Sequence, residues 1–184
     1  MSRMSLMRYD LSVAIYKNGK VEIALEGKIR DGACWLPRLG FEWELPGENS
    51  DFAYFGRGPW ENYLDMHHMA PIGMYESNAR KEYVPYVRPQ EHGNHTAVKW
   101  LQIGNLEFVS DTGFEMNVSE YATRAIFKSK HTDDLVKDGK THLRIDYKVS
   151  GIGSASCGPT LPVSYQLAEK NIRFAFAIRP KGTT

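Results

Sequence analysis

Apolar and polar residues alternate along much of this chain, which is the period of a strand with one buried face. The first two alternating runs cover residues 11–15 and 21–25, and Asn18-Gly19 lies between them. Asparagine and glycine both tolerate the positive φ angles of a type I′ turn. The pattern therefore predicts a β-hairpin over residues 11–25.

The alternation returns at intervals along the chain. Phe41, Trp43 and Leu45 share one face of a strand, and Glu42 and Glu44 take the other face. Further strands are predicted at 52–55, 98–100, 106–109, 114–118, 143–149 and 172–178. Many short strands with turn residues between them and little helix predict an all-β fold, an antiparallel β-sandwich.

Two stretches do not follow this pattern. Residues 65–81 have no sustained period and include Pro71 and Gly73, so we expect an excursion with at most a short helix. Residues 119–134 form the one stretch that favours a helix, with Ser119 as its N-cap.

Composition narrows the class of protein. The formal net charge of the 184 residues is +1, without the basic patch of a nucleic-acid-binding protein. No apolar run reaches the roughly 20 residues that a membrane span needs. Cys34 and Cys157 fit no zinc spacing, and we interpret them as free thiols in a reducing cytoplasm. We expect a cytoplasmic domain over 11–184, with residues 1–10 as a remnant of an expression vector or an unstructured start.

Two Gly/Pro-rich loops, 55–63 and 83–94, hold a dense mixture of aromatic, amide, carboxylate and imidazole side chains. Loops of this composition are suited to meet a polar, ring-shaped ligand or a partner surface. Glu61 and Glu91 could be the carboxylate pair that hydrolyses a glycosidic bond. The interpretation that we favour is structural, with each carboxylate accepting backbone N–H bonds from its own loop.

The other candidate residues in these loops also have alternatives. Trp60 and Tyr63 carry rings that could stack on a sugar or pin the loops to the sandwich. His92 could act with Glu91 as the acid–base pair of an aldose epimerase. His92 and His95 are three residues apart in a loop, which is not the spacing of a helical metal site, so no metal ligand is predicted.

Five motifs, in one order along the chain, resemble the C-terminal domain of family 2 β-galactosidases, called the small chain where it is encoded separately. The motifs are 36–40 (LPRLG), 56–63 (GRGPWENY) with Asp65, 86–94 (YVRPQEHGN), Phe114 with Asn117 and Ser119, and 151–153 (GIG) with 157–159 (CGP). The resemblance covers about 35–176 and implies a super-sandwich related in fold to galactose mutarotase. The family's domain usually begins further upstream, which implies a sandwich trimmed at its N-terminus or a compact version.

The resemblance implies a role within a larger enzyme. The parent enzyme resembles a retaining exo-hydrolase that removes terminal β-D-galactose from lactose-type substrates and uses magnesium and sodium. Its catalytic carboxylates lie in a TIM barrel, and nothing in this chain matches that barrel. We therefore expect a non-catalytic domain or small subunit that binds the TIM-barrel domain or large subunit. It would shape the mouth of the active site, contribute to an oligomer and hold no cofactor of its own.

The resemblance and the loop composition together give seven candidates for contact with a galactoside. They are Trp60, Asn62, Tyr63, Glu91, His92, Asn94 and Ser110. Ser110 stands where some family members carry a tryptophan that stacks on the substrate, so we expect this platform to be missing. Met66 follows Asp65 where the family usually has arginine, which removes an expected salt bridge. Two functions of other classes are alternatives: a free-standing carbohydrate-binding module and an aldose 1-epimerase.

Overall fold

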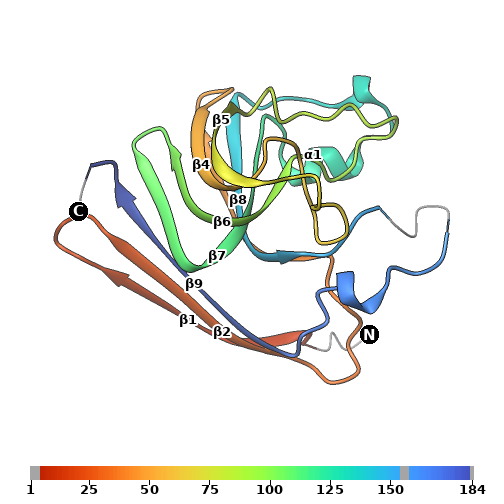
Figure 1. The fold of residues 1–184 in the computed structure, drawn as a ribbon, viewed down its shortest axis with the longest axis horizontal. Helices are drawn as coiled ribbons and strands as arrows, with labels where there is room; N and C mark the ends of the chain where they lie inside the picture. Colours follow the sequence, from red (N-terminus) through yellow and green to blue (C-terminus); the bar gives the residue numbers. More distant parts are fainter. Residues whose placement is uncertain (1–4, 154–157, 183–184) are drawn as a thin grey trace.

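Antiparallel strands make up about half of the described chain (Figure 1). The structure is a computed structural model that describes residues 5–153 and 158–182. The strands are β1 Met7–Ile15, β2 Val21–Ile29, β3 Arg38–Pro46, β4 Asp51–Arg57, β5 Ile72–Asn78, β6 Asn94–Ile103, β7 Leu106–Ser119, β8 Lys140–Val149 and β9 Asn171–Pro180. The helix α1 Thr123–Lys128 and the 3₁₀ helices η1 Thr132–Asp134 and η2 Val163–Tyr165 are short. The prediction of an all-β sandwich is confirmed.

The sheet branches at β7. The main path runs β1-β2-β9-β7-β6-β4-β5, and β8 pairs with β7 on one side and with β3 on the other. Residues 106–109 of β7 pair with β9, whereas residues 115–119 pair with β8. Gly113 lies between these two segments with φ +88°, a conformation that glycine adopts without steric cost. One strand therefore belongs to both branches.

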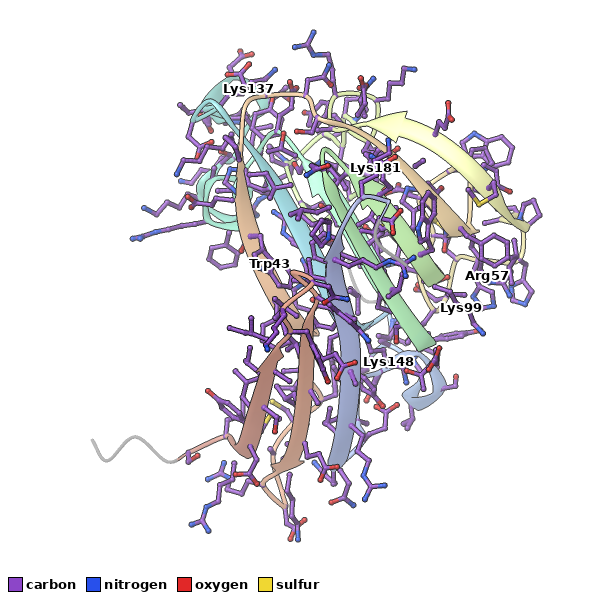
Figure 2. The ribbon with its side chains drawn as sticks, turned by 90° about the vertical axis from the view of Figure 1, so that its left-hand side faces the viewer. Trp43, Arg57, Lys99, Lys137, Lys148 and Lys181 are labelled. Carbon is purple, nitrogen blue, oxygen red and sulfur yellow. The ribbon has the colours of Figure 1, made fainter. Side chains whose placement is uncertain are left out.

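The sandwich core forms where β3 packs against β9. Trp43 projects from β3 toward β9 (Figure 2), with its ring 5.9 Å from Phe176 and 5.7 Å from Phe108. Phe41 lies 5.8 Å from Phe176 and 6.3 Å from Phe174. Aromatic pairs at these distances contribute about 0.5–1.5 kcal/mol beyond the area that they bury. The apolar face predicted for this strand is the face that packs in the core.

Strand β1 extends the apolar face of β9 and β2 beyond this core. Val13 pairs with Ile23 of β2, and Ile23 pairs with Phe176 of β9, so the three side chains share one face. Ile23 packs against the core, but Val13 is 55% exposed. Among the described strands, β1 pairs only with β2. We call the exposed side chains of Tyr9, Leu11, Val13 and Ile15 the β1 row.

The first predicted hairpin is confirmed, with Gly19 in its turn at φ +83°. The hairpin is longer than the alternation indicated, because β1 begins at Met7 and β2 ends at Ile29. Residues 7–10, which we assigned to an unstructured start, pair with residues 26–29. The folded domain therefore begins before residue 11, and residues 1–4 lie outside the described part of the chain.

The prediction for residues 65–81 is wrong in its second half. Residues 72–78 form β5, which pairs with β4 along its whole length. Ile72 and Met74 are 55% and 61% exposed, so apolar side chains stand on the solvent face of this strand. The apolar–polar alternation is lost for that reason, and the strand could not be recognised by its period.

The helix predicted within residues 119–134 is shorter than expected. It spans only α1, and its N-cap residue is Ala122, which makes no side-chain cap bond. Ser119 is the last residue of β7, and its Oγ accepts the backbone N–H of Tyr121 at 3.0 Å. The Ser119 hydroxyl thus shapes the turn that leads to the helix.

No helix in the described part of the chain is long and apolar enough to cross a membrane. Cys34 is an exposed free thiol, and Cys157 lies outside the described residues.

Candidate functional site

Asn62 joins the two Gly/Pro-rich loops. Its backbone N–H donates to the carbonyl of Asn94 at 2.7 Å. Its Nδ2 donates to the carbonyls of Arg57 and Trp60 at 3.1 and 2.9 Å. Its Oδ1 accepts the backbone N–H and the hydroxyl of Thr96 at 2.8 and 2.6 Å. The side chain is fully buried and its hydrogen-bonding capacity is filled, so its role is to hold both loops.

Glu61 braces the loops, but its main-chain donor comes from the second loop and not, as we expected, from its own loop. Its Oε2 accepts the backbone N–H of Gly93 at 2.8 Å, and its Oε1 accepts the hydroxyl of Tyr86. Burial, followed by the hydrogen bond to Glu61, raises the pKa of the Tyr86 hydroxyl above its ordinary value. Gly93 has φ +72°, and a Cβ there would lie 2.8 Å from the carbonyl oxygen of Glu82. This turn therefore requires glycine.

Glu91 is held by an ion pair, not by the backbone bonds that we expected. Arg38 of β3 donates to Glu91 at 2.8 Å and also pairs with Asp146 of β8. Burial alone would lower the pKa of Arg38, but Asp146 and Glu91 raise it above its ordinary value. Asp146 is 2% exposed; burial raises the pKa of its carboxyl and Arg38 opposes that rise. Arg38 therefore links the second loop to the sandwich.

The ion pair between Arg38 and Asp146 can form because the residue opposite Asp146 is glycine. Gly40 lies beside a register shift in β3, opposite Asp146. A Cβ on Gly40 would lie 2.5 Å from the Cα of Asp146 and from the carbonyl oxygen of Ile145. Only glycine lets β3 approach β8 this closely.

A second buried guanidinium, that of Arg144 on β8, fixes the end of β7. It donates to the side chain of Asn117, to Oγ1 of Thr123 at 2.6 Å and to the carbonyl of Tyr121 at 3.1 Å. The amide of Asn117 donates in turn to the carbonyl of His92. The second loop is thereby tied to β7 and β8 as well as to the first loop.

Glu115 of β7 is a buried carboxyl beneath the loops. It is 6% exposed, and its Oε2 accepts a hydrogen bond from Nδ2 of Asn94 at 2.8 Å. Burial is the main reason that the pKa of Glu115 is raised to about 8; the hydrogen bond from Asn94 opposes this rise and the charge of Asp146 adds to it. Glu115 is therefore mainly protonated at neutral pH.

Tyr63 and Asn94, two of the substrate candidates, are fully buried. The Tyr63 hydroxyl and Oδ1 of Asn94 are buried polar atoms without a hydrogen-bond partner in the described part of the chain, as is Oε1 of Glu91. Burial, followed by Glu91 and Glu61, raises the pKa of Tyr63 well above its ordinary value. In this structure the ring of Tyr63 is packed inside the protein and presents no face to a sugar.

Both loop histidines are buried. His92 is 4% exposed, and its Nδ1 lies 2.8 Å from the carbonyl oxygen of Gln90. His95 is fully buried, with Nε2 at 2.8 Å from Oε2 of Glu82 and Nδ1 at 2.9 Å from the hydroxyl of Tyr54. The contacts of both imidazoles are internal.

Trp60 is the substrate candidate that the structure leaves exposed, at 58%. Its side chain lines a cavity of about 540 Å³, within the size range of small-molecule sites. We call it the Trp60 cavity. Its other walls include Met66, Met69, Tyr75, Ser77, Lys81 and Glu82. We missed these residues because they lie in or next to the stretch read as an irregular excursion, and no pattern in it marked them.

Ser110 lies in another part of the molecule. It is 9% exposed on β7, and its hydroxyl donates to the carbonyl of Ala175 on β9 at 2.8 Å. It lines a cavity with residues of β2 and β9 and does not line the Trp60 cavity. The structure thus does not bring Ser110 together with Trp60.

Asp65 holds the segment 151–153. It accepts the backbone N–H of Ile152 at 3.2 Å and that of Gly153 at 2.9 Å. A Cβ on Gly151 would lie 2.5 Å from Cγ of Asp65, so glycine is needed at this contact. Asp65 therefore uses main-chain donors, and Met66, which stands at the position of the family's arginine, lines the Trp60 cavity.

Among the residues that the structure describes, Glu44, Asp138 and His142 have the spacing of a cation site, with ligand atoms within 4.8 Å of one another. Lys140 already pairs with Glu44, and Nε2 of His142 lies 3.1 Å from Asp138. Magnesium and sodium are hard cations that prefer oxygen ligands, and a neighbouring ammonium opposes cation binding. These residues do not fit the magnesium or sodium that the resemblance implies for the parent enzyme.

Together these contacts define an all-β sandwich domain whose two long loops are braced by buried amides and ion pairs. The chain belongs to the β-galactosidase small chain family, whose model matches residues 1–178.

Curated relatives agree with this assignment. The chain is 34% identical to the β-galactosidase of Actinobacillus pleuropneumoniae over 175 residues, which are 95% of this chain and 17% of the relative. It is 35% identical to that of Kluyveromyces lactis over 148 residues, 77% of this chain and 14% of the relative. With the β-galactosidase of Staphylococcus xylosus it shares 30% identity over 169 residues, 90% of this chain and 17% of the relative. The chain therefore spans 14–17% of the length of these relatives.

Proposed function

We propose that this chain is the non-catalytic C-terminal domain or small subunit of a family 2 β-galactosidase. The observation that carries the proposal is the match to a β-galactosidase over 95% of this chain but 17% of the relative. Hydrolysis of terminal β-D-galactose, as in lactose, belongs in this proposal to a TIM-barrel domain or large subunit. This chain then shapes the mouth of the active site and contributes to an oligomeric, cytoplasmic enzyme.

The state of the loop carboxylates supports a non-catalytic role. A retaining or inverting glycosidase needs two carboxyl groups that face the same glycosidic bond. Glu61 is bonded to Tyr86 and Gly93, and Glu91 to Arg38. Both carboxylates thus brace the loops, and the second oxygen of Glu91, Oε1, is buried.

The β1 row supports docking onto a partner domain. Leu11, Val13 and Ile15 are 46%, 55% and 78% exposed on one face of an edge strand. A continuous exposed apolar row of this kind marks an interface, since water would otherwise face it and the open strand edge would invite pairing. The remaining five-sixths or so of a β-galactosidase provide a large surface for this contact.

A second apolar surface lies at the opposite edge of the sheet. Phe55 of β4 pairs with Met74 of β5, and Arg57 pairs with Ile72. Phe55, Ile72 and Met74 are 38%, 55% and 61% exposed. Two apolar edges suit a module with more than one neighbour, as in an oligomeric enzyme.

The magnesium and sodium of the parent enzyme belong, in this proposal, to the catalytic part. The donor set of Glu44, Asp138 and His142 includes an imidazole nitrogen and has Lys140 beside it. The residues of this chain are therefore not assigned as ligands of either cation.

The test is a two-part assay with a chromogenic β-galactoside. The chain alone should show no turnover, and activity should appear when it is combined with the catalytic part of its own enzyme. Val13→Asp should weaken this assembly, because it places a charge in the β1 row. Ser12→Asp is the matched control, since the neighbouring residue points to the other face of the same strand. Ordinary turnover by the chain alone, or equal assembly of both variants, would contradict the proposal.

A further inference from the structure

We propose that the Trp60 cavity is a binding site for a neutral saccharide of one or two pyranose rings. The site is defined by the lining of the cavity alone and is independent of the β-galactosidase proposal. It differs from the sequence interpretation, because Tyr63 and Asn94 are buried elsewhere and the cavity is completed by β4, β5 and the segment that follows β5.

The aromatic wall is held in place by the backbone. The carbonyl of Trp60 accepts the Nδ2 of Asn62 at 2.9 Å, which fixes the loop while the indole remains exposed. Opposite the loop, Tyr75 and Tyr54 lie with ring centroids 5.4 Å apart, and the hydroxyl of Tyr75 donates to the carbonyl of Pro71 at 2.9 Å. The ring of Tyr75 is thereby held in place, and the exposed indole of Trp60 offers a second aromatic face. Aromatic faces of this kind bind the apolar C–H face of a pyranose.

Ser77 and Glu82 supply polar groups to the lining, whereas the hydroxyl of Tyr54, a residue that is 1% exposed, is paired with Nδ1 of His95. Glu82 is 8% exposed; its Oε1 accepts the hydroxyl of Ser77 and its Oε2 lies 2.8 Å from Nε2 of His95. Each carboxylate oxygen has two lone pairs, so one remains on each for a further donor. Sugar hydroxyl groups are donors of the required kind.

The charged residues of the lining are three carboxylates, Glu61, Glu76 and Glu82, and one ammonium, Lys81. Glu61 is matched by Tyr86 and Gly93, so its charge is stabilised within the protein. The two exposed charges at the opening, those of Lys81 and Glu76, have opposite signs. Glu82 adds a further carboxylate to the lining, so an anionic ligand is disfavoured. The carboxylates accept hydrogen bonds from the hydroxyl groups of a neutral ring, and the ammonium donates to them.

Saturation-transfer NMR on the 184-residue chain tests this inference, with lactose and methyl β-D-galactopyranoside as probes. We expect signal transfer to the ring protons of both sugars in the wild-type chain. Galactitol, which has the hydroxyl groups but no ring, should receive much less. Trp60→Ala should weaken binding by at least about tenfold, which corresponds to about 1.4 kcal/mol. Lys81→Ala, which changes an exposed side chain, should weaken binding without affecting the fold.

Phe127→Ala is the matched control, because Phe127 is an exposed aromatic residue of α1 that does not line the cavity. It should bind both sugars as the wild type does, and circular dichroism should show that all variants are folded. The inference is overturned if neither sugar binds, if Trp60→Ala binds as tightly as the wild type, or if galactitol binds equally well. A β-galactosidase role could fail in the two-part assay while this site binds sugar, and the reverse also holds.

Discussion

Replacing Glu115 by glutamine should flatten the pH dependence of stability. Glu115 is 6% exposed, and burial raises its pKa to about 8 from an ordinary value of 4.5. The folded chain therefore keeps a proton that the unfolded chain releases. Between these two pKa values the unfolded state binds fewer protons, so the free energy of unfolding falls as the pH rises.

The magnitude follows from the two pKa values. Each pH unit between about 4.5 and about 8 removes about 1.4 kcal/mol, so the whole range removes about 5 kcal/mol. The contribution is complete below pH 4.5 and is lost as the pH approaches 8. Glutamine cannot ionise. At pH 7 the free energy of unfolding of Glu115→Gln should therefore exceed that of the wild type by about 3 kcal/mol, reduced by the effect of placing the new N–H₂ group near Asn94.

Urea unfolding at several pH values between 5 and 8, followed by tryptophan fluorescence, measures this effect. The change of stability with pH is the decisive quantity, because the altered contact with Asn94 affects all pH values alike. Glu48→Gln, at an exposed turn position, is the control and should keep the wild-type pH dependence. If the wild type and Glu115→Gln lose stability equally from pH 5 to pH 8, the raised pKa of Glu115 is wrong.

Three further substitutions, at Arg38, Asn62 and Gly40, test the contacts that hold the two loops on the sandwich, each by denaturant unfolding. Arg38→Met leaves two carboxylates without their cation and should lower the free energy of unfolding by about 3–5 kcal/mol. Its control is Arg173→Ala, which removes one partner of an exposed ion pair at 3.7 Å. This control should change the free energy of unfolding by less than about 0.5 kcal/mol. Asn62→Ala leaves buried backbone groups of both loops unpaired and should remove about 2–4 kcal/mol; an unchanged midpoint would contradict its role. Gly40→Ala puts a methyl group 2.5 Å from the backbone of β8 and should remove more than about 2 kcal/mol. Gly158→Ala, which meets nothing within 4 Å, should be tolerated.

The sequence predicted those parts of the fold that depend on local pattern. Asn18-Gly19 between alternating runs defined the first hairpin, and the face of Phe41 and Trp43 was the core face. The pattern failed at β5, because Ile72 and Met74 are apolar on the exposed side of an edge strand. Apolar and polar residues alternate where one face of a strand is buried and the other faces water. Apolar side chains on the solvent face remove this alternation.

The candidate site was predictable only in outline. The two loops were found by composition. Glu61 does brace them, but its main-chain donor, Gly93, belongs to the other loop and not to the loop that we expected. The partner of Glu91 could not be inferred, because Arg38 lies 53 residues away in sequence and meets it only through the pairing of β3 with β8. Burial of Asn62 and Tyr63 also depends on long-range packing, which no local pattern records.

The branching of the sheet at β7 has a consequence for how the chain unfolds. Residues 106–109 hold the β9–β2–β1 branch and residues 115–119 hold the β8–β3 branch, while β6 pairs along both. Neither branch can separate without breaking the ladder of the same strand. The amide protons of the two paired segments of β7, 106–109 and 115–119, should therefore exchange with solvent only through global opening, and those of β1, at the free edge, through local fraying. The cooperative unfolding of the domain thus depends on one strand, β7, which has 14 residues.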